Sequence, residues 1–170
     1  FIIVILNEPE GDAILAILPI LTEGNPLLRE KSVPVKKITK KHLKLIRDMV
    51  QTMKDANGVG LAAPQVGVLE RIIVIDIGDG PFALINPEIV SMEGSERDVE
   101  GCLSVPGLNA YVTRAYRVAV KGLNPEGKPV RYEGEGLLAR AIQHEIDHLD
   151  GTLFIDYLAD SNDSEGNKSK

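Results

Sequence analysis

The segment from Gly136 to Gly151 constrains the fold more than any other part of the chain, because it combines a helical pattern of apolar residues with an H-E-x-x-H motif. On a helix that advances roughly 100° per residue, its apolar side chains gather on one side. His144, Glu145 and His148 point toward that apolar side. We therefore predict a helix that ends at Gly151 and has a solvent-exposed polar side formed by Arg140, Gln143, Asp147 and Asp150.

Two histidines one turn apart with a glutamate between them are costly to bury unless they have a compensating partner. A lone buried histidine would be explained by an ordinary hydrogen bond. Side chains four residues apart on a helix lie about 6 Å apart, which is close enough for both to bind one ion. The H-E-x-x-H motif is typical of metal-dependent hydrolases in which the glutamate acts as general base. The pattern predicts a divalent metal at His144 and His148.

The third ligand decides the class of metal site. In metzincin proteases a third histidine follows the motif, but Phe154 stands at that position here. Thermolysin-like proteases use a glutamate well downstream, and only 22 residues follow His148. Cys102, the single cysteine of the chain, is the better candidate. One thiolate and two imidazoles leave one coordination position for water, as in catalytic tetrahedral sites.

Composition limits the remaining possibilities. A length of 170 residues favours one domain, and a single cysteine cannot form an internal disulfide, which indicates a reducing compartment. The net charge of −6 and the lack of a basic run argue against a nucleic-acid partner. No apolar run reaches the ~20 residues that span a membrane. We expect one catalytic domain at 13–160, an N-terminal extension at 1–12 whose role stays open, and a disordered tail at 161–170.

The rest of the chain predicts an α+β fold, with antiparallel sheets around the C-terminal helix that carries H-E-x-x-H. Thr39 is expected to cap a first helix, which ends near Asn57–Gly58. Turns are expected at Gly78–Pro81, Pro87 and Asn124–Gly127. The alternation of residues predicts strands at Arg71–Ile77, Phe82–Asn86, Glu88–Met92, Tyr111–Leu123 and Lys128–Glu133.

Two further motifs lie upstream of the helix. The first, at 58–65, reads Gly-Val-Gly-Leu-Ala-Ala-Pro-Gln and superficially fits a dinucleotide fingerprint. It follows a helix instead of a strand, so that interpretation is weak. Gly58 and Gly60 more plausibly let the backbone approach a peptide substrate. The second motif, at 100–104, reads Glu-Gly-Cys-Leu-Ser and surrounds Cys102.

Together the three segments resemble the peptide deformylase family. That family has G-x-G-x-A-A-x-Q, E-G-C-x-S and H-E-x-x-H in this order, and all three are intact between about Leu18 and Leu158. The resemblance implies a metal-dependent hydrolase of protein biosynthesis. Its reaction removes the N-formyl group from the formyl-methionine of nascent polypeptides, and its partners are N-formyl-methionyl peptides.

The resemblance also implies roles for individual residues. Cys102, His144 and His148 correspond to the metal ligands, and Glu145 corresponds to the general acid/base. Gln65 and the backbone N–H of Leu103 correspond to the donors that stabilise the oxyanion. The ion is expected to be Fe²⁺, although Zn²⁺, Ni²⁺ or Co²⁺ can occupy such a site. Gly58 and Gly60 would border the substrate, beside an apolar pocket for methionine formed by Val59, Leu137 and Ala141.

The chain departs from the family in two places. Many bacterial members end in a basic helix that touches the ribosome, whereas Asp160–Lys170 contains three acids and two lysines. A ribosome contact is therefore not favoured. The region near Asn109, where some members have an arginine, is uncharged. Glu100 and Arg114 are expected to pair and brace the Cys102 loop. We expect a bacterial cytoplasmic protein, with an organelle as the alternative location.

Three other functions use the same residues. A metallopeptidase would use the same metal and glutamate on internal peptide bonds. An enzyme with Cys102 as nucleophile and a histidine as base would form an acyl-cysteine and need no metal. A structural metal site would need a fourth protein ligand, and the remaining histidine, His42, lies on the first helix.

Overall fold

The computed structural model describes residues 15–158, so the predictions for 1–12 and 161–170 lie outside the described residues. No described helix has the length and apolar character needed to span a membrane. The elements, in order, are η1 (Pro26–Arg29), α1 (Lys40–Asp55), β1 (Gly60–Ala62), η2 (Ala63–Val66), β2 (Ile72–Ile75), β3 (Phe82–Glu93), β4 (Glu96–Cys102), β5 (Val105–Arg114), β6 (Arg117–Leu123), β7 (Pro129–Glu135) and α2 (Leu137–Leu149).

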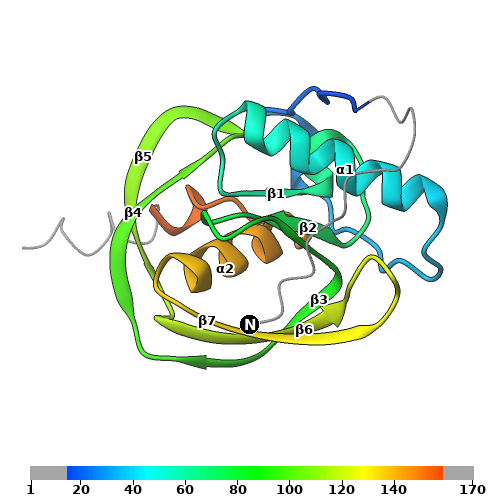
Figure 1. Ribbon diagram of the computed structural model, residues 1–170. Coiled ribbons are helices and arrows are strands. Elements are labelled where there is room, and N and C mark those ends of the chain that lie inside the picture. Colours follow the sequence, from blue (N-terminus) through cyan, green and yellow to red (C-terminus); the bar gives the residue numbers. More distant parts are fainter. Residues whose placement is uncertain (1–14, 159–170) are drawn as a thin grey trace, which may run out of the picture.

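The described strands form two antiparallel sheets around α2 (Figure 1). The larger sheet has five strands in the order β1-β2-β3-β6-β7, and the smaller one is the hairpin β4–β5. In Figure 1, the hairpin passes along one side of α2, while β6 and β7 pass below it. The predicted α+β fold with antiparallel sheets around the C-terminal helix is confirmed.

The five-stranded sheet separates two apolar clusters. Successive side chains of a strand point to opposite faces, and β2 shows the consequence. Ile72 and Val74 pack into the cluster that includes α1, whereas Ile73 and Ile75 pack into the cluster that includes α2. All four residues of β2 are fully buried, which explains why this strand is a continuous apolar run without alternation.

Helix α1 begins after Thr39, as predicted. The residue three positions later is a histidine, and its Nδ1 accepts a hydrogen bond from the backbone N–H of Thr39 at 3.0 Å. The other ring nitrogen of His42 lies 2.8 Å from the carboxylate of Glu70. Ile46, Met49 and Met53 follow helical spacing and are buried against β1 and β2. His42, the histidine outside the H-E-x-x-H motif, therefore has a structural role at this helix end.

Most of helix α2 is buried on both sides, and the prediction of a solvent-exposed polar side is wrong for Arg140 and Gln143, although Asp150 is exposed and Asp147 is partly exposed. Arg140 and Gln143 are only 5 % and 4 % exposed. The hairpin β4–β5 and the residues that follow it cover this side and provide hydrogen-bond acceptors and donors. Helical periodicity correctly assigned the polar residues to one side. It could not show whether their hydrogen-bond partners would be protein groups or water.

Two strand predictions were also wrong. A turn was expected at Pro87, but β3 continues through it with a register shift between Ile85 and Glu88. Proline has no N–H to donate, so a bulge is a tolerated place for it in a strand. The segment Tyr111–Leu123 was expected to be one strand. The chain breaks at Ala115 and Tyr116, and its two parts belong to different sheets.

Three elements were not fully predicted. β1 lies inside the glycine-rich motif and was taken as a loop. β4 was not expected at all, because its residues alternate poorly between polar and apolar. The start of β5 contains Pro106 and Gly107, which are typical of turns. These strands are defined by their pairing partners more than by their own sequence.

The end of α2 provides a test of the packing. Gly151 has a φ of 75°, and a Cβ there would lie 2.5 Å from the carbonyl oxygen of Arg29. Gly67 has a φ of 85° with nothing within 4 Å of a Cβ. We expect Gly67→Ala to cost about 1–2 kcal/mol, the usual cost of a left-handed residue with a side chain. Gly151→Ala should cost clearly more, because the Arg29 carbonyl must also move.

Denaturant unfolding of the two variants beside the parent protein measures this difference. Equal losses of unfolding free energy would show that the contact between Gly151 and Arg29 imposes no constraint of its own.

Candidate metal centre

Three potential ligands converge between the hairpin β4–β5 and helix α2. Cys102 Sγ lies 3.3 Å from His148 Nε2, which lies 3.2 Å from His144 Nε2. All three donor atoms lie within 4.8 Å of one another. The last residue of β4 contributes the sulfur, and consecutive turns of α2 contribute the two imidazoles. The structure therefore brings together the three side chains that the sequence analysis selected.

The spacing of these atoms fits one tetrahedral ion. Two nitrogen ligands at about 2.1 Å from a tetrahedral metal lie roughly 3.4 Å from each other, and a sulfur ligand lies slightly farther. The observed 3.2 and 3.3 Å are close to those values. A soft thiolate with two imidazoles is also a donor set that suits Zn²⁺, Fe²⁺, Co²⁺ and Ni²⁺. The residues present fit a single divalent transition metal.

A buried carboxylate holds His144 in place. Glu100 Oε2 lies 2.6 Å from His144 Nδ1, so Nε2 of the ring points toward Cys102 and His148. Arg114 donates from Nε and Nη2 to the two oxygens of Glu100, at 3.0 and 2.7 Å. A carboxylate on the second nitrogen of a ligand histidine fixes the ring and raises its basicity. The expected pairing of Glu100 with Arg114 is present, but it is buried and not a surface pair.

The charges around Glu100 favour its ionised form. Burial alone would raise the pKa of Glu100, but hydrogen bonds from His144 and Arg114 outweigh that effect and lower the pKa to about 2. Burial also opposes a charge on His144, yet Cys102 and Glu100 raise the pKa of His144 to about 10. Burial and the charge of His144 hold the pKa of His148 well below its ordinary value. The two imidazoles therefore differ, with His144 favouring its protonated form and His148 its neutral form.

Glu145 lies beside the cluster in an apolar setting. It is 4 % exposed, and its Oε2 has no hydrogen-bond partner among the described residues. Burial, partly opposed by the charge of His144, raises the pKa of Glu145 to about 7. A Cβ on Gly60 would lie 2.5 Å from Glu145 Oε1, so glycine is needed there for the carboxylate to fit. A carboxylate with a free oxygen and a pKa near neutrality is suited to accept and release protons.

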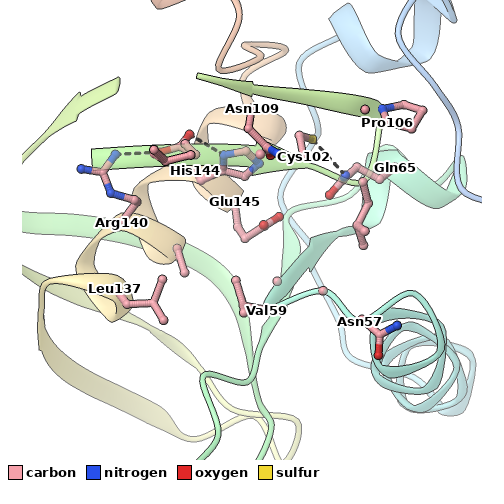
Figure 2. A pocket seen from close by; sticks show the side chains of 18 residues that line it. Asn57, Val59, Gln65, Cys102, Pro106, Asn109, Leu137, Arg140, His144 and Glu145 are labelled. Atoms are coloured by element: carbon pink, nitrogen blue, oxygen red, sulfur yellow. Dashed lines mark hydrogen bonds and ion pairs between the residues drawn. The ribbon is translucent and has the colours of Figure 1, made fainter. Parts of the chain in front are cut away.

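Gln65 reaches the same place from the other side. Its Oε1 accepts a hydrogen bond from the backbone N–H of Ala62 at 2.9 Å, which fixes the direction of the amide. Its Nε2 lies 3.0 Å from Ser104 Oγ and 3.7 Å from Cys102 Sγ. The amide donor therefore faces the cluster (Figure 2). Ser104 was quoted only as part of a motif, and its role in holding Gln65 was not predicted.

A cavity of about 470 Å³ opens next to these residues. Figure 2 shows Val59 and Leu137 on the side of His144 and Glu145 away from Cys102. Val59 and Leu137 are exposed at its rim, and Ala141 is buried in its wall. Gly58, Gly60 and Leu103 also border it, so all eleven predicted site residues except His148 line this cavity. Asn109, in the region that the sequence analysis noted for its missing arginine, also lines the cavity. Sequence reasoning missed Asn57, Val99, Pro106 and Arg140, which line it and carry no motif signal.

Comparison with known proteins identifies the family. The profile of the family described as "Polypeptide deformylase" matches residues 17–164. The chain belongs to the polypeptide deformylase family. The peptide deformylase of Desulfitobacterium hafniense is 56 % identical over 142 residues, covering 84 % of this chain and 95 % of that protein. That of Halothermothrix orenii is 60 % identical over 144 residues, covering 84 % of this chain and 94 % of that protein.

Solved structures of the family agree with the fold. The crystal structure of peptide deformylase from Thermotoga maritima has a TM-score of 0.82 at 45 % identity, and the alignment covers 84 % of this chain and 97 % of that one. The structure from Thermus thermophilus has a TM-score of 0.83 at 42 % identity, covering 88 % and 90 %. The family consists of hydrolases that use one metal ion and remove N-formyl groups from nascent polypeptides. The predicted family, fold class and hydrolytic function are confirmed.

Proposed function

We propose that this chain hydrolyses the N-formyl group of formyl-methionyl polypeptides at one divalent ion held by Cys102, His144 and His148. The observation that carries the proposal is the convergence of these three donors beside the buried carboxylate of Glu145, at the inner end of an open cavity. We further propose Fe²⁺ as the ion in the cell, among the metals that this donor set accepts, and a bacterial cytoplasm as the location. The tail at 161–170 lies outside the described residues, and its acidic character does not favour a ribosome contact.

The reaction requires a nucleophile, a proton carrier and a stabilised oxyanion. When bound, the ion supplies Lewis acidity, which lowers the pKa of water and polarises the formyl carbonyl. Glu145 takes a proton from the attacking water and delivers it to the leaving amine. Its apolar surroundings support this role, because they raise its pKa to about 7 and make both protonation states accessible near neutral pH.

The oxyanion receives hydrogen bonds from the Gln65 amide and from the backbone N–H of Leu103. The bond from Ala62 prevents the Gln65 amide from rotating, so its donor is oriented before the substrate arrives. One such donor contributes roughly 3 kcal/mol in an acyl-transfer site. A Cβ on Gly58 would lie 2.7 Å from Leu103 Cδ1, which supports a role for Gly58 in keeping Leu103 in place.

The rim of the cavity supports a preference for methionine at the first position. Val59 and Leu137 present exposed apolar side chains there, and Ala141 leaves space between them. Burial of each methylene contributes about 0.8 kcal/mol. A methionine side chain that covers these residues therefore gains affinity that alanine cannot gain.

The nucleophilic-cysteine hypothesis has one observation in its favour. Cys102 Sγ lies 3.3 Å from His148 Nε2, which is a distance at which a histidine could activate a thiol. The same histidine also faces His144 Nε2, and a general base would not need this second nitrogen. The metal dependence of the family argues for the metal site.

The first prediction concerns the ligand set. Cys102→Ala and His148→Ala should each lose the bound metal and the activity together, because two ligands cannot hold a divalent ion at a catalytic site. His42→Ala is the matched control, since that histidine contacts Thr39 and Glu70 and not the cluster. Metal content per chain and deformylation of formyl-Met-Ala-Ser are measured on the same samples. A fully active, metal-free preparation of either ligand variant would overturn the assignment.

The second prediction separates Glu145 from the ligands. Glu145→Gln and Glu145→Ala should retain the metal and lose at least ~10²-fold in kcat, the usual contribution of a general acid/base. The glutamine variant preserves the shape beside Gly60 and removes only the basic oxygen. Near-normal turnover in the glutamine variant would make Glu145 a structural residue and the mechanism wrong.

The third prediction concerns selectivity. The values of kcat/KM should be much higher for formyl-Met-Ala-Ser than for acetyl-Met-Ala-Ser, because an acetyl methyl must fit between Gly60, Gln65 and the metal. The value of kcat/KM should also be lower for formyl-Ala-Ala-Ser than for formyl-Met-Ala-Ser. Leu137→Ala should reduce the preference for methionine over alanine by roughly 10-fold.

Leu108→Ala is the control for Leu137, because Leu108 is similarly exposed but does not line the cavity. Equal values for formyl and acetyl peptides would contradict deformylation as the reaction. An unchanged methionine preference in Leu137→Ala would remove the pocket and leave the reaction intact.

A further inference from the structure

The metal ligands come from two parts of the fold that are not joined by strand pairing. Cys102 belongs to the hairpin β4–β5, and His144 and His148 belong to α2. Among the described residues, the hairpin pairs with no strand of the five-stranded sheet. An isolated two-stranded hairpin is marginally stable at best. The position of the thiol relative to the imidazoles therefore depends on contacts outside the ladder. Ser104 contacts Glu23 and Gln65, and α2 contacts both strands of the hairpin.

The pairing of the hairpin shifts register before its last pair, Cys102 with Val105. Its ladder is regular from Glu96 to Gly101, and then a register shift occurs between Gly101 and Cys102. Cys102 therefore lies just beyond the regular part of the ladder, and it is partly exposed. Its position depends on how firmly the regular part is held.

Arg140 holds that regular part at three points. Its Nη2 donates to the carbonyl of Glu96 in β4 at 2.8 Å, and its Nη1 donates to the carbonyl of Val112 in β5 at 2.8 Å. Nη1 also donates to Glu100 Oε1 at 3.1 Å. Glu100 is two residues before Cys102, and its other oxygen contacts His144. One side chain of α2 thus contacts both strands of the hairpin and the carboxylate that orients a ligand.

Burial makes these three contacts hard to replace. Arg140 is 5 % exposed, and two of its three acceptor residues, Glu100 and Val112, are also buried. Loss of its donors would remove one hydrogen-bond partner from each of two hairpin carbonyls and from Glu100 Oε1, while Arg114 would still contact Glu100. Such losses are costly where the groups are shielded from water. Only the planar guanidinium can serve three acceptors in fixed directions, whereas a lysine is a single point charge.

We propose that Arg140 is a positioning residue of the metal centre, which fixes Cys102 against His144 and His148 by bridging β4, β5 and Glu100. The inference rests on the ligand set proposed above. It goes beyond that set, because Arg140 lies outside the three motifs and is four residues from the nearest ligand in sequence. Removal of Arg140 should loosen the thiolate more than it unfolds the protein.

A matched arginine contacts the C-terminal end of the same helix. Arg71 Nη1 donates to the carbonyl of Leu149 at 3.1 Å and to Asp150 at 3.0 Å. It therefore contacts α2 through a backbone carbonyl and a carboxylate, as Arg140 contacts the hairpin. It has no contact with the hairpin or with Glu100 among the described hydrogen bonds and ion pairs. Substitutions of Arg71 therefore measure the general effect of removing an arginine that is hydrogen-bonded to the end of α2.

The experiment uses the full chain loaded with Co²⁺. The parent protein should show a thiolate-to-cobalt charge-transfer band, and Co²⁺ release to excess chelator is followed by its disappearance. Arg140→Met should show a weaker or shifted band and release Co²⁺ at least about 10-fold faster, the lower end of effects seen for residues that support metal ligands. Arg71→Met should keep the parent spectrum and release rate. Release that is no faster in Arg140→Met than in Arg71→Met overturns the proposal.

A second pair, Arg140→Lys and Arg71→Lys, decides the matter if Arg140→Met does not fold. Arg140→Lys keeps the charge and most of the volume, yet it should still release Co²⁺ several-fold faster than Arg71→Lys. Equal rates in this pair overturn the bridging role, because charge alone would then suffice. A parent protein without a thiolate band would instead remove Cys102 from the ligand set, so failure of the proposed function is distinguishable from failure of this inference.

Discussion

The buried carboxylate of Glu100 is the interaction on which the rest of the site depends. Arg114, Arg140 and His144 all contact it, and each of these residues comes from β5 or α2. A buried carboxylate without partners would be very unfavourable. With these partners in place, it joins the hairpin to the helix at the point where the three proposed metal ligands meet. The geometry of the site and the attachment of the hairpin therefore depend on the same ionic cluster.

The position of α2 between sheet and hairpin allows its two sides to serve different purposes. One side buries Ile142 and Leu149 against the five-stranded sheet, which stabilises the helix by burial of apolar area. The other side uses Arg140, Gln143 and Asp147 to bind the hairpin and the residue that follows it. His144 and His148 lie where the two sides meet. A helix fixed on both sides keeps the two imidazoles at one separation, which favours binding of a single ion.

Glu145 shows how packing produces reactivity at the same place. Its carboxylate is close to Gly60, where any side chain would collide with it, and it has a free oxygen among the described residues. Its burial, partly opposed by the charge of His144, raises its pKa. The amide of Gln65 is held from the opposite side by Ala62 and Ser104. The two groups proposed for proton transfer and for stabilisation of an oxyanion therefore line the same cavity.

The amino-acid sequence alone was enough to predict the hydrolytic function and the two helices. Cys102, His144, Glu145 and His148 could be selected because ligand types and helical spacing are local properties of a sequence. The pairings between distant segments, in contrast, could be seen only in the folded chain. Arg140 was predicted to face solvent, and β4 was not predicted, because helical periodicity separates polar from apolar residues but does not reveal what covers them. The contacts of Arg140 with the two strands of the hairpin join residues that are 28 and 44 positions apart in the chain, and no local pattern records such a contact.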